Sequence, residues 1–587
     1  MLASYFLSRT LVPTMAKYLL KGHAPHEIGK KHNFFAGFQI GFEQRFERLR
    51  NGYRVLLDSF LHQRKLFLLT FLGACVGSVV LLFPWLGEDF FPQVDAGQIK
   101  MHLRARTGTR IEETARLCDL IDQSIRRMIP ADELETIIDN IGVPYSGLNL
   151  SYSNSAPVGP ADADILVTLK GNHRPTQTVI QMMRRNLGSQ FPGVAFYFLP
   201  VDIVSQILNF GLPAPIDVQV IGNNLLANRA FAEKLMDKIR YVPGIVDLRI
   251  QQPFDAPRLN IDVDRVRAQQ VGYTQRDVAG NLLVALSGSS QTAPTYWLDP
   301  KNGVSYNVAV QAPQYQVASL EDLQNIPITG AAGRAPQTIG NLAVFSRDAE
   351  LGTVSHYDAQ PVIDIYGGVD RTDLGSVARP VTRLVNQAKK DLPRGSQIIV
   401  RGQAETMRTS FQGLLAGLAF SIVLVYFLIV VNFQSWLDPF IIISALPAAI
   451  AGIVWMLFLV HTTVSVPALT GAIMCMGVAT ANSILVVSFA REQMQEGLSA
   501  IQAASAAGFT RFRPVIMTAL AMIIGMVPMA LGLGEGGEQN APLGRAVIGG
   551  LLLATTATLL FVPVFFSVLH DRRVARARAR SSPPKDA

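Results

Sequence analysis

The sequence of 587 residues contains little cysteine and little charge. Of its three cysteines, Cys75 and Cys475 fall in long apolar runs and Cys118 stands alone in a polar region, so no disulfide framework is expected. The absence of a CxxC motif and of a histidine-rich cluster argues against a structural metal, and no cofactor is expected. Only 16% of the residues are charged and 49% are hydrophobic. So low a charge content is unusual for a soluble protein.

Charge is also missing from the centres of the apolar runs. Six runs approach the length of about 20 residues that crosses a bilayer, and none has Asp, Glu, Lys, Arg or His at its centre. The predicted spans are residues 66–86, 411–431, 438–460, 466–490, 511–533 and 545–569. Residues 1–20 form a shorter apolar segment without a basic start or a small-residue cleavage site. We therefore expect the end of a transmembrane helix there and not a signal peptide.

The net charge of +8 is concentrated at three places. Basic residues crowd the segment before the first span, flank the loop between the fourth and fifth spans, and fill the tail at 571–587. The loop at 534–544 has two glutamates and no Lys or Arg. Counting crossings puts the basic segments on one side of the membrane, which the positive-inside rule makes cytoplasmic. Nucleic-acid binding is a weaker explanation, because the arginines flank spans and the tail lacks interleaved aromatics.

Residues 21–65 lie between two membrane segments on that cytoplasmic side. Apolar side chains recur on one face of this segment at three- and four-residue steps, and basic residues fall on its other faces. The apolar residues are Phe38, Phe42, Phe46, Leu49 and Tyr53. We therefore predict an amphipathic helix that rests in the lipid interface.

The segment at 87–409 has ordinary globular composition and lies on the side opposite the basic loops. It contains four strand–helix–strand patterns, which predict an α+β domain of two ferredoxin-like split βαβ subdomains. The first covers residues 87–207, and the second is formed by residues 208–260 and 359–409. Residues 261–358 have their own strands and a KNGV turn and are expected to be an inserted domain. An open α/β pair is the alternative, but no glycine-rich phosphate loop supports it.

Small residues are frequent in residues 410–570, which we expect to form a five-helix transmembrane domain. Gly413 and Gly417 make a GxxxG motif, which typically allows close helix packing. A second small-residue set falls on another helix: Ala445, Ala448, Ala449 and Gly452.

A few polar residues interrupt these charge-poor spans. Thr480, Asn482 and Ser483 fall on one helix, and Thr518 falls on the next. Arg511 opens that second helix, and Thr518, seven residues further, lies on the same face about 10.5 Å deeper. Each hydroxyl could simply bond a backbone carbonyl one turn back, as Ser and Thr often do in membranes.

Four motifs occur in a recognisable order: GEDFFPQVDAGQ at 87–98, FQSWLDP at 433–439, GVATANSILVVSFAR at 477–491 and RFRPVIMTALAMIIGMVPMAL at 511–531. Together they resemble the second half of the resistance–nodulation–division (RND) efflux permeases of bacterial inner membranes, of the hydrophobe/amphiphile type. The resemblance covers essentially the whole chain. It implies a permease of two repeated six-span halves that exports drugs or other amphiphiles by proton antiport.

The resemblance also implies an assembly. The expected unit is a homo- or hetero-trimer that works with a periplasmic adaptor and an outer-membrane channel. The α+β subdomains would be periplasmic porter subdomains, and the insertion at 261–358 would be a docking or funnel domain. Residues 1–20 would be the end of the sixth span.

The same resemblance gives the polar residues a role. Family members pair aspartates on the fourth span with a lysine on the tenth span and with an arginine and a threonine on the eleventh. Arg511 and Thr518 match the last two, whereas Ala481 stands at the lysine position and departs from the drug-efflux pattern. The aspartates belong to the half that this chain lacks, so the acidic wall of the proton site is expected on another polypeptide. The neutral wall expected on this chain consists of Thr480, Asn482, Ser483 and Thr518.

The segment at 142–161 matches the family's flexible loop between substrate pockets. Residues of this loop and of a following strand are the expected substrate contacts: Tyr145, Leu148, Leu150, Tyr152, Phe196 and Phe198. A solvent loop and a core strand are the ordinary alternative. Because the loop has less phenylalanine than those of drug pumps, we expect a less aromatic substrate. Heavy-metal members resemble the chain too, but their charged membrane ladder and methionine cluster are not visible in the sequence.

Two further classes of function are open. A non-transporting remnant or an assembly subunit is favoured by Ala481 and by the missing first half. A membrane-anchored periplasmic enzyme is disfavoured, because no nucleophile–base pair, carboxylate dyad or metal-ligand spacing stands out. The sequence therefore predicts a transport subunit and not an enzyme.

Overall fold

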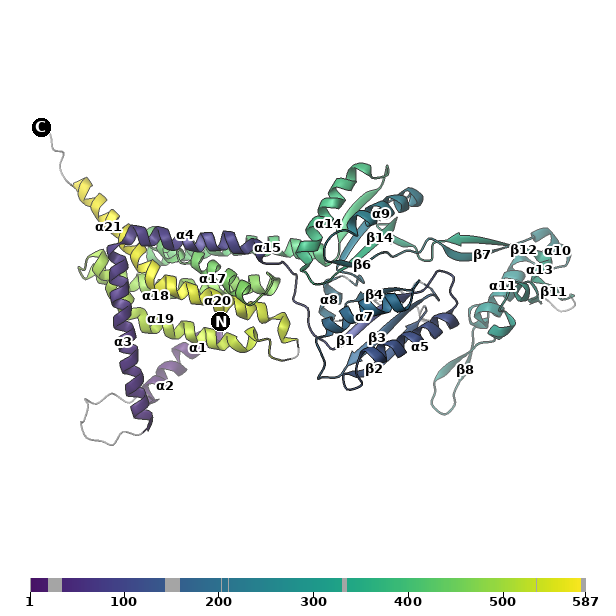
Figure 1. Cartoon of the computed structure of the whole chain (residues 1–587), viewed down its shortest axis with the longest axis horizontal. Coiled ribbons are helices and arrows are strands. Elements are labelled where there is room, and N and C mark those ends of the chain that lie inside the picture. Colours follow the sequence, from purple (N-terminus) through teal and green to yellow (C-terminus); the bar gives the residue numbers. More distant parts are fainter. Residues whose placement is uncertain are drawn as a thin grey trace.

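A computed structural model describes residues 2–19, 34–142, 159–201, 203–209, 211–329, 335–534 and 536–581. The described chain is elongated (Figure 1). A helical bundle occupies one end, two α/β units lie in the middle, and a smaller unit lies at the far end (Figure 1).

The bundle is built from long apolar helices. Among the described residues, six helical segments are long and apolar enough to cross a membrane, which confirms the six predicted spans: Arg64–Trp85, Gln403–Phe433, Leu437–Leu459, Val466–Gln495, Ala500–Ala530 and Ala541–Arg572. Their helices are α4 (Arg64–Leu82), α15 (Gln403–Phe433), α16 (Leu437–Ile443), α17 (Leu446–Leu459), α18 (Val466–Gln495), α19 (Ala500–Ala530), α20 (Ala541–Thr556) and α21 (Val562–Ser581). A π-helical turn at Ala557–Phe561 joins the last two. Local signals set the starts, because proline opens α17, α18 and α20 and a capping box of Ser499 and Gln502 opens α19.

Two glycines bring α17 and α20 into backbone contact. A Cβ atom on Gly452 would lie 2.2 Å from the Gly549 carbonyl oxygen, and one on Gly549 would lie 2.5 Å from the Gly452 carbonyl oxygen. Only glycine fits at both positions. Gly413 and Gly417 make no such contact within the described chain, because no described atom of a neighbouring element lies within 4 Å of a Cβ atom at either residue, so their predicted close packing stays a prediction. Both lie on α15, which the rest of the described chain leaves almost uncovered.

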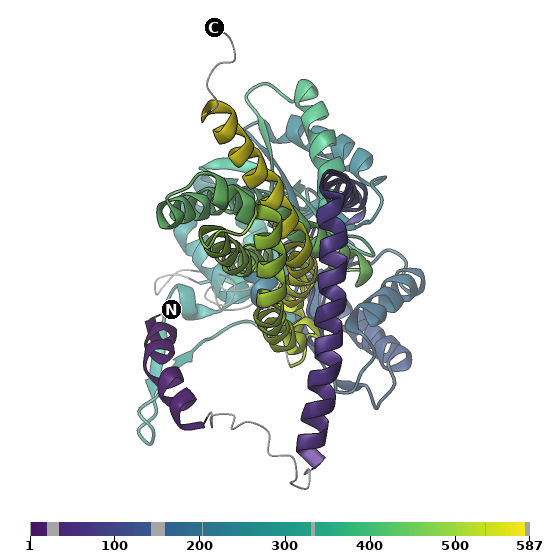
Figure 2. The same cartoon turned by 90° about the vertical axis from the view of Figure 1, so that its left-hand side faces the viewer.

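Helix α3 (Phe34–His62) crosses the end of the bundle that lies farther from the α/β units (Figure 1). Figure 2 looks onto this end and shows α3 in front of the bundle. Tyr53, Leu57 and Leu61 of α3 are buried against bundle helices. The predicted amphipathic segment is therefore helical over the part described. The predicted N-terminal helix end forms two short helices, α1 (Leu2–Arg9) and α2 (Leu11–Leu19).

The first α/β unit has the connectivity β-α-β-β-α-β. Its elements are β1 (Gln98–Arg104), α5 (Ile111–Met128), β2 (Leu134–Ile141), β3 (Asp162–Leu169), α7 (Thr176–Gln190) and β4 (Ala195–Leu199). The strands form an antiparallel sheet in the order β2-β3-β1-β4. Alternation places Ile99, Met101 and Leu103 of β1 toward the helices, where each is at most 1% exposed. Its core is thus one sheet face covered by two helices.

The second unit repeats this plan. Its elements are α8 (Ile203–Leu208), which leads into it, β5 (Ile216–Ile221), α9 (Leu225–Ile239), β6 (Ile245–Ile250), β13 (Ser355–Tyr357), β14 (Gln360–Val369), α14 (Leu374–Ala388) and β15 (Gln397–Arg401). Strand β14 pairs with β6 and β5, and β5 pairs with β15, which gives the same inner order as in the first sheet. All of these pairs are antiparallel.

The smaller unit is inserted between β6 and β13 on a two-stranded stem. The stem pairs β7 (Ala256–Val263) with β12 (Ala343–Glu350) along their whole length. The unit itself comprises α10 (Arg265–Gln270), α11 (Gln275–Ser287), β8 (Thr295–Leu298), β9 (Ser305–Val308), α12 (Leu320–Gln324), β10 (Pro327–Ile328), β11 (Gln337–Thr338) and α13 (Ile339–Leu342). The insertion thus begins earlier than the predicted residue 261. It also ends earlier than 358, because β13 pairs with β14 of the second sheet.

Candidate functional site

Polar side chains of three helical elements meet inside the bundle. The Thr518 hydroxyl of α19 donates to the Asn482 side-chain oxygen of α18 at 3.0 Å. It also lies 3.0 Å from the Val515 carbonyl of its own helix. One residue further along α18, the Ser483 hydroxyl lies 2.9 Å from the Thr558 hydroxyl, and both residues are fully buried. Two neutral pairs therefore join α18 to α19 and to the π-helical turn.

The Thr518–Asn482 pair reaches the surface of the bundle. Asn482 is only 4% exposed, whereas Thr518 lies on the uncovered side of α19. The apolar residues Met517 and Ile524, which lie nearby on α19, are 61% and 66% exposed. Hydrocarbon offers no hydrogen bonds to a polar group. This surface of α19 therefore has a polar spot at membrane depth within an apolar setting.

Two further residues predicted to support the proton relay, Thr480 of the wall and Arg511, lie apart from the pairs. Thr480 donates to two carbonyls one turn back on its own helix, at 3.0 and 2.9 Å. Hydrogen bonds of this kind, from a threonine hydroxyl to its own helix, are common in membrane helices and indicate a structural role. The Arg511 guanidinium lies over the Phe489 ring, 5.0 Å from its centroid. Its Nε has no hydrogen-bond partner among the described residues.

Thr558 is a member of the polar group that sequence reasoning missed. The available signal was the run of threonines at 555, 556 and 558 within the last span. The contact with Ser483 depends on the π-helical turn, in which the Val562 N–H bonds to the Ala557 carbonyl. Such a turn holds one more residue than an α-helical turn, so a 3.6-residue period does not predict where Thr558 points.

A charged cluster closes the end of the bundle away from the α/β units. Within FQSWLDP, Gln434 takes a left-handed φ of 49° and ends α15, and the Ser435 hydroxyl oxygen accepts from the Asp438 N–H at 3.4 Å. Asp438 is 2% exposed. Its carboxylate lies 3.0 Å from His570 Nε2 of α21 and 3.5 Å from Arg491 Nη1 of α18. This motif therefore holds three helices together, which is a structural role.

The two α/β units are joined by a polar contact on α7. The Arg184 guanidinium lies 2.8 Å from Asp247 and 3.5 Å from Asp370, both on the second unit. Gln177 and Gln181, on the same helix, donate to Asp370 at 2.9 and 3.0 Å. A cavity of about 300 Å³ adjoins this contact.

The predicted substrate contacts are only partly placed. Tyr145, Leu148, Leu150 and Tyr152 lie outside the described residues. Phe196 and Phe198 pair with Leu103 and Met101 across β1 and β4. Directly opposed residues share a sheet face, so both rings face the helices and not the open face of the sheet.

The two phenylalanines differ in what they contact. Phe196 packs against Phe191 in the core, with ring centroids 6.4 Å apart. Phe198 lies under the Arg184 guanidinium, 4.8 Å from the ring centroid, and lines the 300 Å³ cavity. Phe198 alone of the pair is therefore placed beside open space.

The face of the second sheet opposite its helices carries two buried carboxylates, Asp217 and Asp364, which the sequence analysis did not predict as site residues. Gln219 donates to Asp217 at 2.8 Å and to Asp364 at 3.1 Å. Gln252 donates to Asp364 at 2.7 Å. Burial, and then the nearby Asp364 carboxylate, raises the pKa of Asp217. The two acids are tied together by amide donors.

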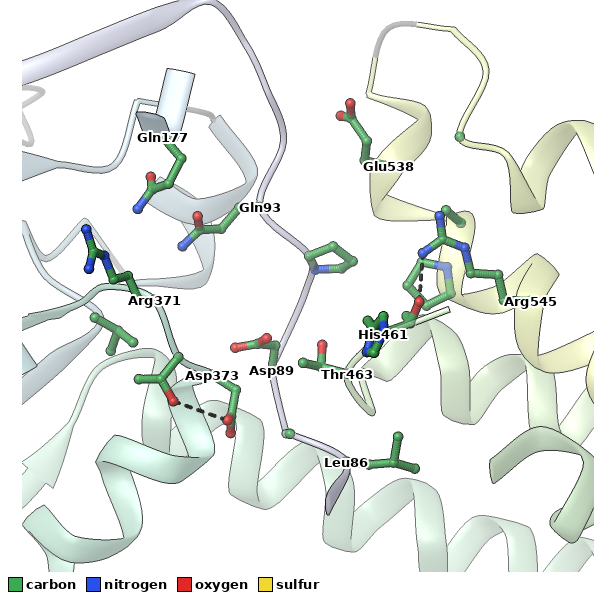
Figure 3. A pocket seen from close by; sticks show the side chains of 18 of the residues that line it. Leu86, Asp89, Gln93, Gln177, Arg371, Asp373, His461, Thr463, Glu538 and Arg545 are labelled. Carbon is green, nitrogen blue, oxygen red and sulfur yellow. Dashed lines mark hydrogen bonds between the residues drawn. The ribbon is translucent and has the colours of Figure 1, made fainter. Parts of the chain in front are cut away.

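A second cavity, of about 660 Å³, lies where the bundle meets the α/β units. Figure 3 shows Asp89 and Asp373 on the side of the α/β units, and Arg545 and Glu538 on the side of the bundle. Asp89 accepts from the Leu374 N–H at 2.8 Å. Burial raises the pKa of Asp89 in spite of this hydrogen bond. The cavity is therefore lined by charges of both signs at the edge of the membrane bundle.

These features define a multi-pass membrane protein with a neutral polar site among its spans and α/β units at one end. The family model for the AcrB/AcrD/AcrF family matches residues 1–570. The chain therefore belongs to this family, and the predicted resemblance to RND efflux permeases is confirmed.

Several relatives are similar along nearly the whole chain. Protein HelA of Legionella pneumophila is 25% identical, over 99% of this chain and 53% of the relative. Cation efflux system protein CzcA of Alcaligenes sp. is 25% identical, over 89% of this chain and 49% of the relative. Multidrug resistance protein MdtC of Proteus mirabilis is 25% identical, over 96% of this chain and 52% of the relative. The chain spans about half the length of these relatives.

A solved structure has the same fold. The crystal structure of a heavy metal efflux pump superposes with a TM-score of 0.76 at 24% identity, over 90% of this chain and 53% of that one. The membrane bundle and the α/β units are therefore arranged as in an RND pump.

Proposed function

We propose that this chain acts as the C-terminal half of a proton-driven RND efflux permease in the bacterial inner membrane. The two α/β units act in the periplasm as ferredoxin-like porter subdomains, and the inserted unit acts as a docking or funnel domain. A companion half supplies the proton-binding aspartates. The assembly is a trimer that works with a periplasmic adaptor and an outer-membrane channel, and its substrates are small amphipathic compounds.

The observation that carries this proposal is the polar spot formed by Thr518 and Asn482. Within the described part of the chain, no acceptor bonds to the amide N–H groups of Asn482. A carboxylate of the companion half, placed against α19, would accept hydrogen bonds from this amide. Hydrogen bonds to the charged form of an acid favour ionisation. The neutral wall would thereby promote proton release without the lysine that Ala481 replaces.

Reconstitution with a matching first half of an RND permease tests this mechanism. Asn482→Ala is expected to lower proton-dependent efflux roughly tenfold, because it removes a hydrogen bond to a charged group. Thr518→Ala removes only a bond to the neutral Asn482 side chain and is expected to lower efflux less, by about two- to tenfold. Thr470→Ala is the matched control, because Thr470 bonds only to a carbonyl of its own helix α18, at 2.9 Å. Efflux driven by a proton gradient with this chain alone would refute the proposal. A normal rate for Asn482→Ala would refute the role of the wall.

Divalent-cation export is the second candidate function. The names of several relatives support it, among them the cobalt-zinc-cadmium resistance protein CzcA of Cupriavidus metallidurans. The residues described here contain no group of three or more His, Cys, Asp or Glu that could hold a metal ion. Growth of cells that carry both halves, in Zn²⁺, Co²⁺ or Cd²⁺ and separately in cationic detergents, discriminates the two substrates. No protection against either kind of compound would favour the remaining alternative, a non-transporting assembly subunit.

A further inference from the structure

Helix α3 is packed on the bundle unusually closely at one point of α19. A Cβ atom on Gly508 would lie 2.5 Å from the Tyr53 hydroxyl oxygen and 2.6 Å from a methyl carbon of Leu57. Four residues further along α19, the Phe512 ring stacks on the Tyr53 ring with centroids 4.5 Å apart. Glycine at 508 therefore lets a tyrosine of α3 lie between α19 and the last span.

The buried hydroxyl group of Tyr53 forms a hydrogen bond with the backbone of the π-helical turn. It donates to the Leu559 carbonyl oxygen at 2.7 Å, and Tyr53 is 8% exposed. Turns of this kind are rare and frequently occur at functional sites. Here a donor from a different helix bonds to the backbone of the turn.

The same turn presents a side chain to the polar wall. Thr558 precedes Leu559, and its hydroxyl lies 2.9 Å from the Ser483 hydroxyl. Asn482, next to Ser483 on α18, accepts from Thr518 at 3.0 Å. An unbroken series of contacts therefore runs from Tyr53 through the π-helical turn to the residues that face the proposed proton site.

We propose that Tyr53 is a positioning residue for this wall, and that α3 sets the spacing of the hydroxyl and amide groups through the π-helical turn. The consequence for transport rests on the proposed function, but the mechanical link does not. Because α3 lies across the end of the bundle (Figure 1), a movement of α3 against the spans would be passed to the wall through Tyr53.

Methyl NMR of the full chain in lipid nanodiscs, with labelled threonine, tests the link directly. Tyr53→Phe keeps the ring stacked on Phe512 and removes only the hydroxyl. We expect it to shift the methyl signals of both Thr558 and Thr518 by more than a linewidth. The matched control is Tyr426→Phe, because Tyr426 of α15 donates to the Trp436 carbonyl just before α16 at 3.0 Å, outside this series of contacts. The control is expected to move neither signal.

A double variant distinguishes coupling that passes through Ser483 from a general loss of packing in the bundle. In a Ser483→Ala background, Tyr53→Phe is expected to leave the Thr518 signal in place, because the link between the turn and α18 is already cut. A Thr518 signal that does not respond to Tyr53→Phe, or that responds equally with and without Ser483, overturns the proposal. So does an equal response to Tyr426→Phe.

A transport readout distinguishes this inference from the proposed function. With the companion half present, Tyr53→Phe should displace the pH profile of efflux in the same direction as Ser483→Ala, and the double variant should add no further displacement. If the NMR coupling holds but no combination of halves transports, the proposed function fails and the positioning role stands. If efflux is normal and its pH profile is unmoved by Tyr53→Phe, the positioning role in transport is refuted.

Discussion

The contact of α17 with α20 allows a sharp test of the bundle. In Gly549→Ala, the new methyl group would lie 2.2 Å from Met456 Cβ and 2.5 Å from the Gly452 carbonyl oxygen, whereas ordinary contact begins at 3.4 Å. The two helices would have to separate by about 1 Å, a gap that forfeits a quarter to a half of each dispersion contact across it. Because backbone atoms cannot rotate away, we expect the upper part of the range for overpacking, about 3 kcal/mol of lost stability.

Gly413→Ala is the matched control. It adds the same methyl group to a transmembrane helix, but no described atom of a neighbouring element lies within 4 Å of it. Replacing a glycine inside a helix by alanine is expected to stabilise the protein by about 0.5–1 kcal/mol. The two variants should therefore differ by about 4 kcal/mol in opposite directions from the wild type.

Thermal unfolding of the purified chain measures this difference. At about 2–4 °C per kcal/mol for a unit of 150–250 residues, Gly549→Ala should unfold roughly 6–12 °C below the wild type. Gly413→Ala should unfold at or slightly above the wild-type temperature. Equal midpoints for the two variants would show that α17 and α20 do not meet at these glycines, and the reasoning from their backbone contact would be wrong.

Two further predictions concern the α/β units. Arg184→Ala leaves Asp247 and Asp370 without the cation that they share, so the two units should separate more easily, with a loss of stability of about 1.5–3 kcal/mol in calorimetry. The control Arg116→Ala breaks an exposed ion pair with Glu113 on α5 and should leave the unfolding transition unchanged. Burial, and then Asp139, raises the pKa of Asp122 to about 6, above its value of about 3.9 in an unfolded chain. The folded state therefore binds more protons between these values, so stability should fall as pH rises through about 6 and Asp122→Asn should flatten that slope; identical pH profiles for variant and wild type would contradict this.

The spans and the sheets were predictable because each has a strong periodic signal. A charge-free run of about 20 residues has few alternatives to a membrane helix. In β1 of the first α/β unit, apolar and polar residues alternate, and the apolar Met101 and Leu103 lie in the core. The repeated strand–helix–strand pattern also matched the two sheets, which share one strand order.

What the sequence did not provide was the identity of each partner. Gly413–Gly417 and Gly452 look alike as small residues, but only the fold shows that Gly452 meets Gly549 while α15 stays uncovered. Phe196 and Phe198 alternate as expected, yet the register with β1 decides which way they face, and it turns them to the helices. The π-helical turn adds one residue to a helical period, so the pairing of Thr558 with Ser483 was invisible.

The stem of the inserted unit has a mechanical consequence. Its two strands bond mainly to each other along their length, and chain enters and leaves the far unit side by side. A two-stranded ribbon of this kind resists stretching along its strands but bends and twists easily. The far unit can therefore change its direction, its length or its sequence without a change in the sheet that carries it.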